Sequence, residues 1–521
     1  MPPNNTLSSS NNRSFTLRIT FIATLGGLLF GYDTAVISGA VASLNHVFIA
    51  PLDLEANAAS AMQGFVISAA LIGCVLGASV AGYLSQRFGR RMTLFVAAAL
   101  FFASALGSAY PEMGSSAPSH EFLYHFVSYR VLGGVGVGIA SMVSPMYIAE
   151  IAPADKRGAL VSLNQFAIVF GILLVYFVNY AIAAQGDEAW LHDLGWRYMF
   201  TSMAIPSGLF FILLFFAPET PRYLVLRGKH NEAQGLLARL VPDAKAALEE
   251  IKHSFAQEVA VSLAPYYRFM ASWAGAFVLL FGLLYAMSAG SAFEIAFIAS
   301  FVIALVIPMK SYGISIITVG VLLSAFQQFV GINAVLYYAP EIFKSMGQDT
   351  DAALLQTVVV GAINMLFTVV AIMTVDKFGR KPLLVIGALV MAAAMLGLGF
   401  AFTVNIAPIA KLFCMLLYVA GFAMSWGPVC WVMLSEIFPN HLRSAVMSIA
   451  VAAQWVSNFL VSWTFPIMNE NEALTASFNH GFAYLVYGSL SLCAAIFVYK
   501  ILPETKGKSL EELENLWKKK S

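Results

Sequence analysis

The segment Gly82-Tyr-Leu-Ser-Gln-Arg-Phe-Gly-Arg-Arg91 recurs later in the chain as Val375-Asp-Lys-Phe-Gly-Arg-Lys381. Two more motifs repeat at nearly the same distance: Glu150 with Arg157 recurs as Glu436 with Arg443, and Pro218–Arg222 recurs as Pro503–Gly507. The three displacements are 290, 286 and 285 residues. Repeats of this kind are typical of membrane transporters built from two related halves.

The composition around these repeats excludes an ordinary water-soluble protein. Of the 521 residues, 59% are hydrophobic and 11% are charged, whereas soluble domains have about 25% charged residues. The net charge of +1 gives no basic excess for binding nucleic acid. The four cysteines lie in apolar stretches without the spacing of metal ligands, so we expect no metal and no cofactor.

A membrane-spanning helix needs about 20 mostly apolar residues, because each backbone amide must be satisfied within the segment. Two sets of six such stretches are found, separated by an unusual pair at 269–288 and 292–308. The twelve main stretches are 15–44, 61–84, 92–109, 121–149, 158–184, 197–217, 313–339, 351–375, 382–403, 408–437, 443–467 and 479–502. The sequence therefore predicts an all-α polytopic membrane protein of two six-helix bundles with an extra transmembrane hairpin.

The organisation expected from these stretches has six parts. They are an N-terminal cytoplasmic arm (1–14), an N-terminal six-helix bundle (15–222), a cytoplasmic helical linker (223–268), an extra apolar hairpin (269–308), a C-terminal six-helix bundle (309–502) and a cytoplasmic tail (503–521).

The distribution of Lys and Arg predicts the orientation, since cytoplasmic loops retain positive charge during insertion. Of the 29 basic residues, 25 fall on one side, whereas Arg197, Lys344 and Lys411 fall on the other. Arg130 lies within a span. Both termini are therefore expected in the cytoplasm of a multi-pass inner-membrane protein.

Two ionisable side chains interrupt the spans, and such residues are usually functional because a charge in the bilayer is costly. Asp33 lies in the first span and Arg130 begins the fourth. A guanidinium beside a carboxylate keeps it ionised, whereas its withdrawal favours proton uptake. The pair is therefore a candidate proton switch; a purely structural buried ion pair is the alternative.

The repeated charges all fall at the cytoplasmic ends of predicted spans, where acids and bases of both halves can pair. Such pairs act as a latch when they form in one state of a carrier and are solvated in another. Fixing the topology is the simpler alternative. The candidates for this cytoplasmic charge latch are Arg90, Glu150, Arg157, Glu219, Arg380, Glu436, Arg443 and Glu504.

The chain resembles the sugar porter family of the major facilitator superfamily, in motifs that cover nearly all of it except about 255–312. The shared segments are Leu25–Asp33, Ser144–Glu150, Gln327–Asn333 and Ser425–Trp431. Gln86 departs from the family, which usually has Asp at this position of its loop motif. The resemblance implies proton-coupled uptake, or symport, of D-xylose or a closely related monosaccharide by alternating access, with no enzymatic activity.

A sugar site needs amides and aromatic rings, because amides match hydroxyl groups and rings match the C–H faces of a pyranose. The resemblance implies that hydrogen bonds to the sugar come from Gln165, Gln327, Gln328, Asn333, Trp431 and Gln454. It implies a pocket wall of Phe30, Tyr337, Asn364, Gly427 and Trp455. Hydrogen bonding between helices is the alternative role for any one of these amides.

The expected partners are a monosaccharide, a proton as the coupling ion and the lipid bilayer, with the chain acting as a monomer. An uncoupled facilitator, a symporter for glucose, galactose or arabinose, and a sugar receptor without transport remain alternatives. The sequence does not decide between the sugars, since discrimination can depend on one contact.

Overall fold

The computed structural model describes residues 6–115, 117–153, 157–258, 314–438 and 443–506, and these residues form helices and connecting turns without a β-strand. The extra hairpin expected at 269–308 lies outside the described residues. Eleven segments of the described chain are long and apolar enough to cross a membrane. A further helix, α21, has 28 residues, or about 42 Å at 1.5 Å per residue, which also exceeds the bilayer core.

The N-terminal half contains six spans. They are α1 (Thr6–Leu44), α2 (Ala56–Phe88), α3 (Arg90–Ala109), α4 (Leu123–Ile151), α5 (Arg157–Ala183) and the pair α7 (Trp196–Ser202) and α8 (Ala204–Leu213). Short turns connect them: η1 (Asn45–Ile49), η2 (Ala50–Leu52), η3 (Ser119–Phe122), α6 (Glu188–Trp190), η4 (Leu191–Gly195) and η5 (Leu214–Phe216).

The C-terminal half repeats this arrangement with two broken spans. Its helices are α14 (Ile314–Phe329), α15 (Ile332–Tyr337), α16 (Ala339–Ser345), α17 (Thr350–Phe378), α18 (Arg380–Thr403), α19 (Pro408–Met424), α20 (Trp426–Ile437), α21 (Arg443–Glu470), α22 (Glu472–Phe478) and α23 (Phe482–Ile501). Each of the twelve main stretches expected from the sequence therefore coincides with a helix or with a helix pair.

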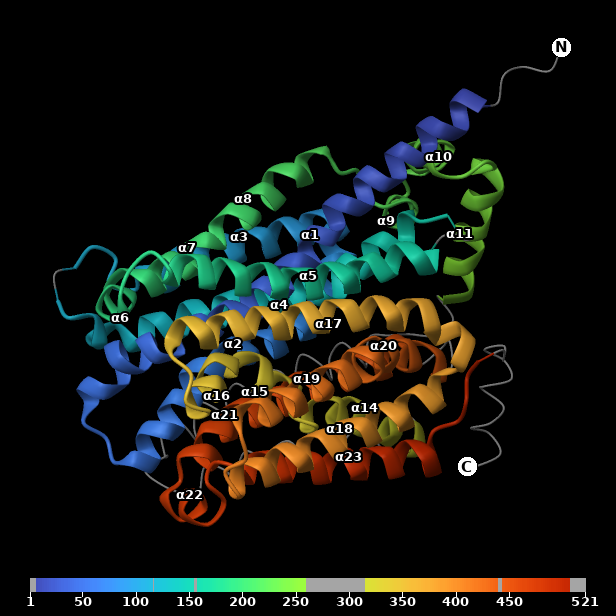
Figure 1. Ribbon diagram of the computed structural model, residues 1–521. Helices are drawn as coiled ribbons and strands as arrows, with labels where there is room; N and C mark the ends of the chain where they lie inside the picture. Colours follow the sequence, from blue (N-terminus) through green and yellow to red (C-terminus); the bar gives the residue numbers. More distant parts are fainter. Residues whose placement is uncertain (1–5, 116, 154–156, 259–313, 439–442, 507–521) are drawn as a thin grey trace.

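The two halves lie side by side with their long helices roughly aligned (Figure 1). Helix α2 packs against α21, and α5 packs against α17, so these pairs form the junction between the halves. We call the end of the bundle with Arg90 and Arg380 the basic end, and the end with α6, α16 and α22 the distal end (Figure 1).

Three shorter helices cover the basic end of the N-terminal half: α9 (Pro221–Leu226), α10 (His230–Leu240) and α11 (Ala244–Glu258). Helix α1 extends beyond its apolar stretch and packs against α10, where Arg239 lies over the ring of Phe15 at 3.5 Å. Residues 223–258 of the segment expected as a linker (223–268) are largely helical, and the rest of that segment lies outside the described residues. The start of α1 at Thr6 shows that the first span continues as a helix into the expected arm.

Candidate functional site

Asp33 and Arg130 form a buried ion pair between α1 and α4. Arg130 NH1 lies 2.8 Å from Asp33 Oδ1, and Arg130 NH2 donates to the backbone carbonyl of Asp33 at 3.1 Å. The two side chains are 0% and 1% exposed. Asp33 Oδ2 and Arg130 Nε have no hydrogen-bond partner among the described residues. One oxygen of the carboxylate, Asp33 Oδ2, therefore remains available for a proton or a water molecule.

The guanidinium of Arg130 also faces an aromatic ring, since its central carbon lies 5.5 Å from the centroid of Phe200 on α7. This contact stabilises the cation on one side while Asp33 neutralises it on the other. The close approach of α4 depends on Gly133, because a Cβ atom there meets the hydroxyl of Ser104 and lies 3.3 Å from Asp33 Oδ1. Small residues thus keep the pair tightly enclosed.

The seventh span breaks between α14 and α15, and the break brings two of the predicted sugar ligands together. Gly331 has a φ of 94°, a left-handed conformation that glycine adopts without steric cost. The chain therefore turns after Val330, and Asn333 Nδ2 donates to Gln328 Oε1 at 2.6 Å. The break at Gly331 therefore places the two amides next to each other.

Gln327 points to a second break, between α19 and α20. Its Nε2 atom donates to the carbonyls of Trp426 and Gly427 at 2.8 and 3.2 Å. Its Oε1 atom is buried without a partner in the described part of the chain. The break lies at Ser425, two residues before Gly427-Pro428, a dipeptide that disfavours a continuous helix.

Aromatic rings of the two halves meet near a third predicted ligand. The ring centroids of Phe30 on α1 and Trp455 on α21 are 5.4 Å apart. Among the described residues, Gln454 Oε1 and Trp455 Nε1 are buried atoms without a hydrogen-bond partner. Buried polar atoms normally have partners, so these unpaired atoms are candidates for binding a polar ligand.

The remaining predicted pocket residues occupy α5, α15, α17 and α20. Gln165 and Trp431 are half-buried, whereas Asn364 and Tyr337 are buried. The Tyr337 hydroxyl accepts from Asn458 Nδ2 at 3.4 Å. Asn458 is not among the residues predicted from the sequence, although it lies four residues after Gln454 and so on the same face of a helix.

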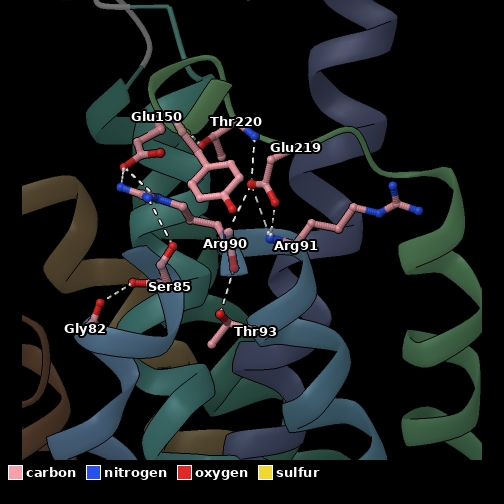
Figure 2. Close-up of polar contacts among 10 residues, drawn as sticks. Gly82, Ser85, Arg90, Arg91, Thr93, Glu150, Glu219 and Thr220 are labelled. Atoms are coloured by element: carbon pink, nitrogen blue, oxygen red, sulfur yellow. Dashed lines mark hydrogen bonds and ion pairs between the residues drawn. The ribbon is translucent and has the colours of Figure 1, made fainter. Parts of the chain in front are cut away.

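The first charge cluster at the basic end binds three helices of the N-terminal half together (Figure 2). Arg90 NH2 and Nε donate to Glu150 Oε1 at 2.8 and 3.2 Å. The backbone amides of Arg90 and Arg91 donate to Glu219 at 3.0 and 3.1 Å. Gly89 has a φ of 96°, and its missing side chain leaves room for the Glu219 carboxylate.

The second cluster repeats this geometry in the C-terminal half. Arg380 NH2 lies 3.0 Å from Glu436 Oε1, and the amides of Arg380 and Lys381 donate to Glu504 at 3.1 and 3.0 Å. Thr505 adds a hydroxyl bond of 2.6 Å to Glu436 Oε2. In this conformation, each of these pairs lies within its own half.

The other two latch candidates differ from these. Arg157 is exposed, and its Nε donates to the backbone carbonyl of Ala149 at 3.1 Å. Arg443 begins α21, and its side chain lies outside the described residues.

The two equivalent glutamates of these clusters differ electrostatically. Burial raises the pKa of Glu219 above its usual value, against the opposing effect of the amides of Thr220, Arg91 and Arg90. Burial acts in the same direction on Glu504 but is outweighed, because four backbone amides lower the pKa of its carboxyl. The sequence repeat therefore preserves the contacts but not the degree of burial.

Hydrogen bonds between the halves indicate which end of the bundle is closed. Trp463 Nε1 donates to Ala61 O at 3.1 Å, and the Tyr176 hydroxyl donates to Leu336 O at 2.7 Å. Asn471 Nδ2 lies 3.4 Å from Asn57 Oδ1. All three bonds lie toward the distal end of their helices, so the halves are joined at the distal end in this conformation.

Two related helical bundles around buried amides, with an ion pair inside the membrane, define a secondary carrier. A family model described as "Sugar (and other) transporter" matches residues 19–517. The chain belongs to this family of transporters, which are not enzymes, and its fold is that of the major facilitator superfamily.

Two relatives described as sugar transport proteins match nearly the whole chain. It is 52% identical to the D-xylose-proton symporter of Escherichia coli strain K12, over 98% of this chain and 97% of that protein. It is 41% identical to the glucose facilitated diffusion protein of Zymomonas mobilis, over 98% of this chain and 99% of that protein.

Solved structures agree with this comparison. The E. coli xylose transporter in an inward open conformation matches with a TM-score of 0.79 and 50% identity, covering 96% of this chain and all of the other. The same transporter bound to 6-bromo-6-deoxy-D-glucose matches with a TM-score of 0.77 and 52% identity, covering 97% of this chain and all of the other.

Proposed function

We propose that this protein is a proton-coupled symporter that takes up D-xylose or a closely related monosaccharide across the bacterial inner membrane. The observation that carries the proposal is the buried Asp33–Arg130 pair, with one carboxylate oxygen unpaired, in a carrier whose core also holds unpaired amides. The identity of 52% with a D-xylose-proton symporter over nearly the full length supports the sugar and the coupling ion.

The coupling follows from linkage between two sites. Arg130 favours the ionised carboxylate of Asp33 while the pair is intact, and its withdrawal leaves a desolvated group that takes a proton. If protonation and sugar binding both favour the same conformation, a proton gradient drives sugar uptake. Asp33 lies three residues after Phe30, whose ring meets Trp455, and this short path connects the proton site to the sugar site.

The sugar site is built where the broken spans of the C-terminal half face the junction. Gln328 and Asn333 lie on either side of the Gly331 break, and Gln454 and Trp455 lie on the helix that packs against α2. Gln165, Gln327 and Trp431 complete the hydrogen-bonding set, with Tyr337, Asn364 and Gly427 in the wall. No cofactor is needed, since the proton is the coupling ion.

The orientation follows from the positive charges. The basic end faces the cytoplasm, with both termini on that side, and the distal end faces outward. Because the distal end is the joined one, the conformation described above is closed to the outside. The charge clusters at the cytoplasmic end act as a latch between conformations, and the chain works as a monomer.

A facilitator without proton coupling is the second candidate, favoured by the 41% identity to a glucose facilitated diffusion protein. Uptake by purified protein in liposomes separates the two. A panel of labelled D-xylose, glucose, galactose and arabinose is tested with and without an inward proton gradient. Gradient-dependent accumulation of one pentose or hexose supports symport, whereas equilibration alone supports a facilitator.

A further inference from the structure

Two histidine rings stack on each other at the distal end, next to the junction of the halves. His46 lies in η1, directly after α1, and His192 lies in η4, before α7. Their ring centroids are 4.6 Å apart and their planes differ by 16°. His46 is exposed and His192 is half-buried, so protons of the external medium reach the pair directly.

Ser43 holds the ring of His192 in position. Its hydroxyl lies 3.2 Å from the carbonyl oxygen of Leu191 and 3.0 Å from Nδ1 of His192. These contacts fix the ring in the plane in which it stacks on His46.

The same pair lies at the part of α1 that contacts the other half. Helix α1 packs against α15 and α16 of the C-terminal half, and η1 continues from its end. Lys344 on α16 interacts electrostatically with His192 across the junction. Other ionisable groups on the surrounding elements are Glu188 on α6, Asp193 on η4, His120 and Glu121 on η3, which packs against η1, Glu341 on α16 and Glu470 at the end of α21.

We propose that His46 and His192 form a second proton-binding site, distinct from Asp33, and that its protonation opens the outer side of the carrier. Two protonated imidazoles repel each other at the stacking distance, and a protonated His192 also repels Lys344 across the junction. Separating α1 from α16 relieves this repulsion and exposes the half-buried ring of His192 to water, which favours its charged form. Protonation and outward opening therefore support each other by linkage.

One acid nearby opposes this effect, since the charge of Glu188 favours the protonated form of His192, but burial of His192 and the neighbouring His46 act more strongly against that form. Glu341 faces Lys344 at 3.8 Å, and burial raises the pKa of its carboxyl, with Glu470 and Glu188 acting in the same direction. The side chain of Glu341 is half-buried, so its carboxyl compensates added positive charge less than a fully solvated carboxylate does. The site thus couples an acidic exterior to the conformation that accepts sugar from outside.

The test measures the junction itself. Spin labels at positions 57 and 471, whose native side chains touch across the junction, report its opening by double electron–electron resonance. The full-length protein, with Cys414 and Cys493 replaced by serine, is measured in liposomes without sugar between pH 7.5 and 5.5. We expect the open population to rise about threefold as the pH falls.

The variant His46→Asn/His192→Asn removes the titrating rings but keeps polar side chains, and its open population should not change with pH. His120→Asn, on the same face in η3, is the matched control and should behave as the parent protein. Lys344→Met should weaken the acid response, because it removes the cation across the junction. Sugar binding by each variant verifies its folding.

Three results would overturn the inference: no pH response in the parent protein, an unchanged response in the double variant, or a response lost only in Asp33→Asn. The inference rests on the proposed function for the orientation of the carrier in the membrane. Different results would nevertheless reject the inference and the proposed function. Proton-driven uptake with a pH-independent junction rejects the histidine site alone, whereas uncoupled transport with a histidine-dependent junction rejects proton coupling alone.

Discussion

Arg130 binds both the side chain and the main chain of Asp33, with bonds of 2.8 Å to Oδ1 and 3.1 Å to the backbone carbonyl. The guanidinium therefore fixes the position of α1 as well as the charge of the carboxylate. Loss of the charge on Asp33 is therefore expected to change the contact between α1 and α4 as well.

Asp33→Asn should abolish accumulation against a gradient while preserving sugar counterflow. Asparagine has nearly the same shape and retains an acceptor for Arg130, but it cannot take up and release a proton. Uptake and counterflow of labelled xylose in liposomes measure the two properties. Asp53→Asn, in an exposed turn, is the control, and sugar accumulation by Asp33→Asn would remove Asp33 from the coupling role.

Gln328→Ala should raise the dissociation constant for the sugar by about tenfold, which corresponds to the loss of one or two hydrogen bonds. The change also removes the acceptor for Asn333 Nδ2, so part of the loss comes from a misplaced second ligand. Calorimetric titration of the purified protein gives the constant. Gln185→Ala, on an exposed part of the chain, should leave it unchanged, and equal affinity in both variants contradicts the assignment.

Gly64→Ala should favour the conformation open to the outside. An added Cβ meets the backbone carbonyl of Trp463 on α21, so the distal junction cannot close without displacing one helix. The distance between labels at positions 57 and 471 should lengthen, and net uptake should slow. Gly235→Ala is the matched control, since its Cβ meets nothing within 4 Å.

Arg90→Ala should destabilise the protein by about 3 kcal/mol, because it leaves a largely buried Glu150 without its partner. The two side chains are only 8% and 11% exposed. Lys229→Ala breaks a pair that is 56% and 59% exposed, and this change should cost less than about 1 kcal/mol. Denaturation of the purified variants in detergent measures the free energy of unfolding of each. Adding Glu150→Ala to Arg90→Ala should recover part of the loss, and strict additivity would exclude coupling.

Glu504→Gln should lower the melting temperature at pH 7 more than at pH 4. The pKa of Glu504 lies below its usual value of 4.5 in the folded state, so its ionised form stabilises the fold above that pH and the effect is lost in acid. Burial raises the pKa of Glu219, so ionisation of this carboxyl opposes folding. Glu219→Gln should therefore lower the melting temperature less at pH 7, and equal pH profiles for the two variants would contradict this difference.

Much of the fold was accessible from the sequence because its determinants are local. A run of about 20 apolar residues forms a spanning helix wherever it lies in the chain, since lipid forces the backbone to satisfy its own hydrogen bonds. The repeated motifs around Arg90 and Arg380 predicted two related halves, because a motif repeat can be recognised from the sequence alone. The structure adds that both clusters pair within their own half in this conformation, which the repeat does not specify.

The site was only partly accessible in this way. Asp33 and Arg130 stood out because each is a charge in an apolar span, but their 2.8 Å contact joins helices that are 97 residues apart. Both breaks have a local signal, because Gly331 permits a positive φ and Gly427-Pro428 lies two residues after the break at Ser425, but neither signal specifies which side chains face the break. Asn458 was missed because a single amide in an apolar helix resembles many that only bond between helices.

The sequence by itself determined that the chain lies in a lipid bilayer. It also determined the spans, the two halves and the kinds of side chain that reach the core. The tertiary structure decided which of those side chains meet, including the stack of His46 on His192, which are 146 residues apart. The reason is physical. Transfer into lipid depends on the composition of one segment, whereas a contact between helices depends on how closely their backbones pack.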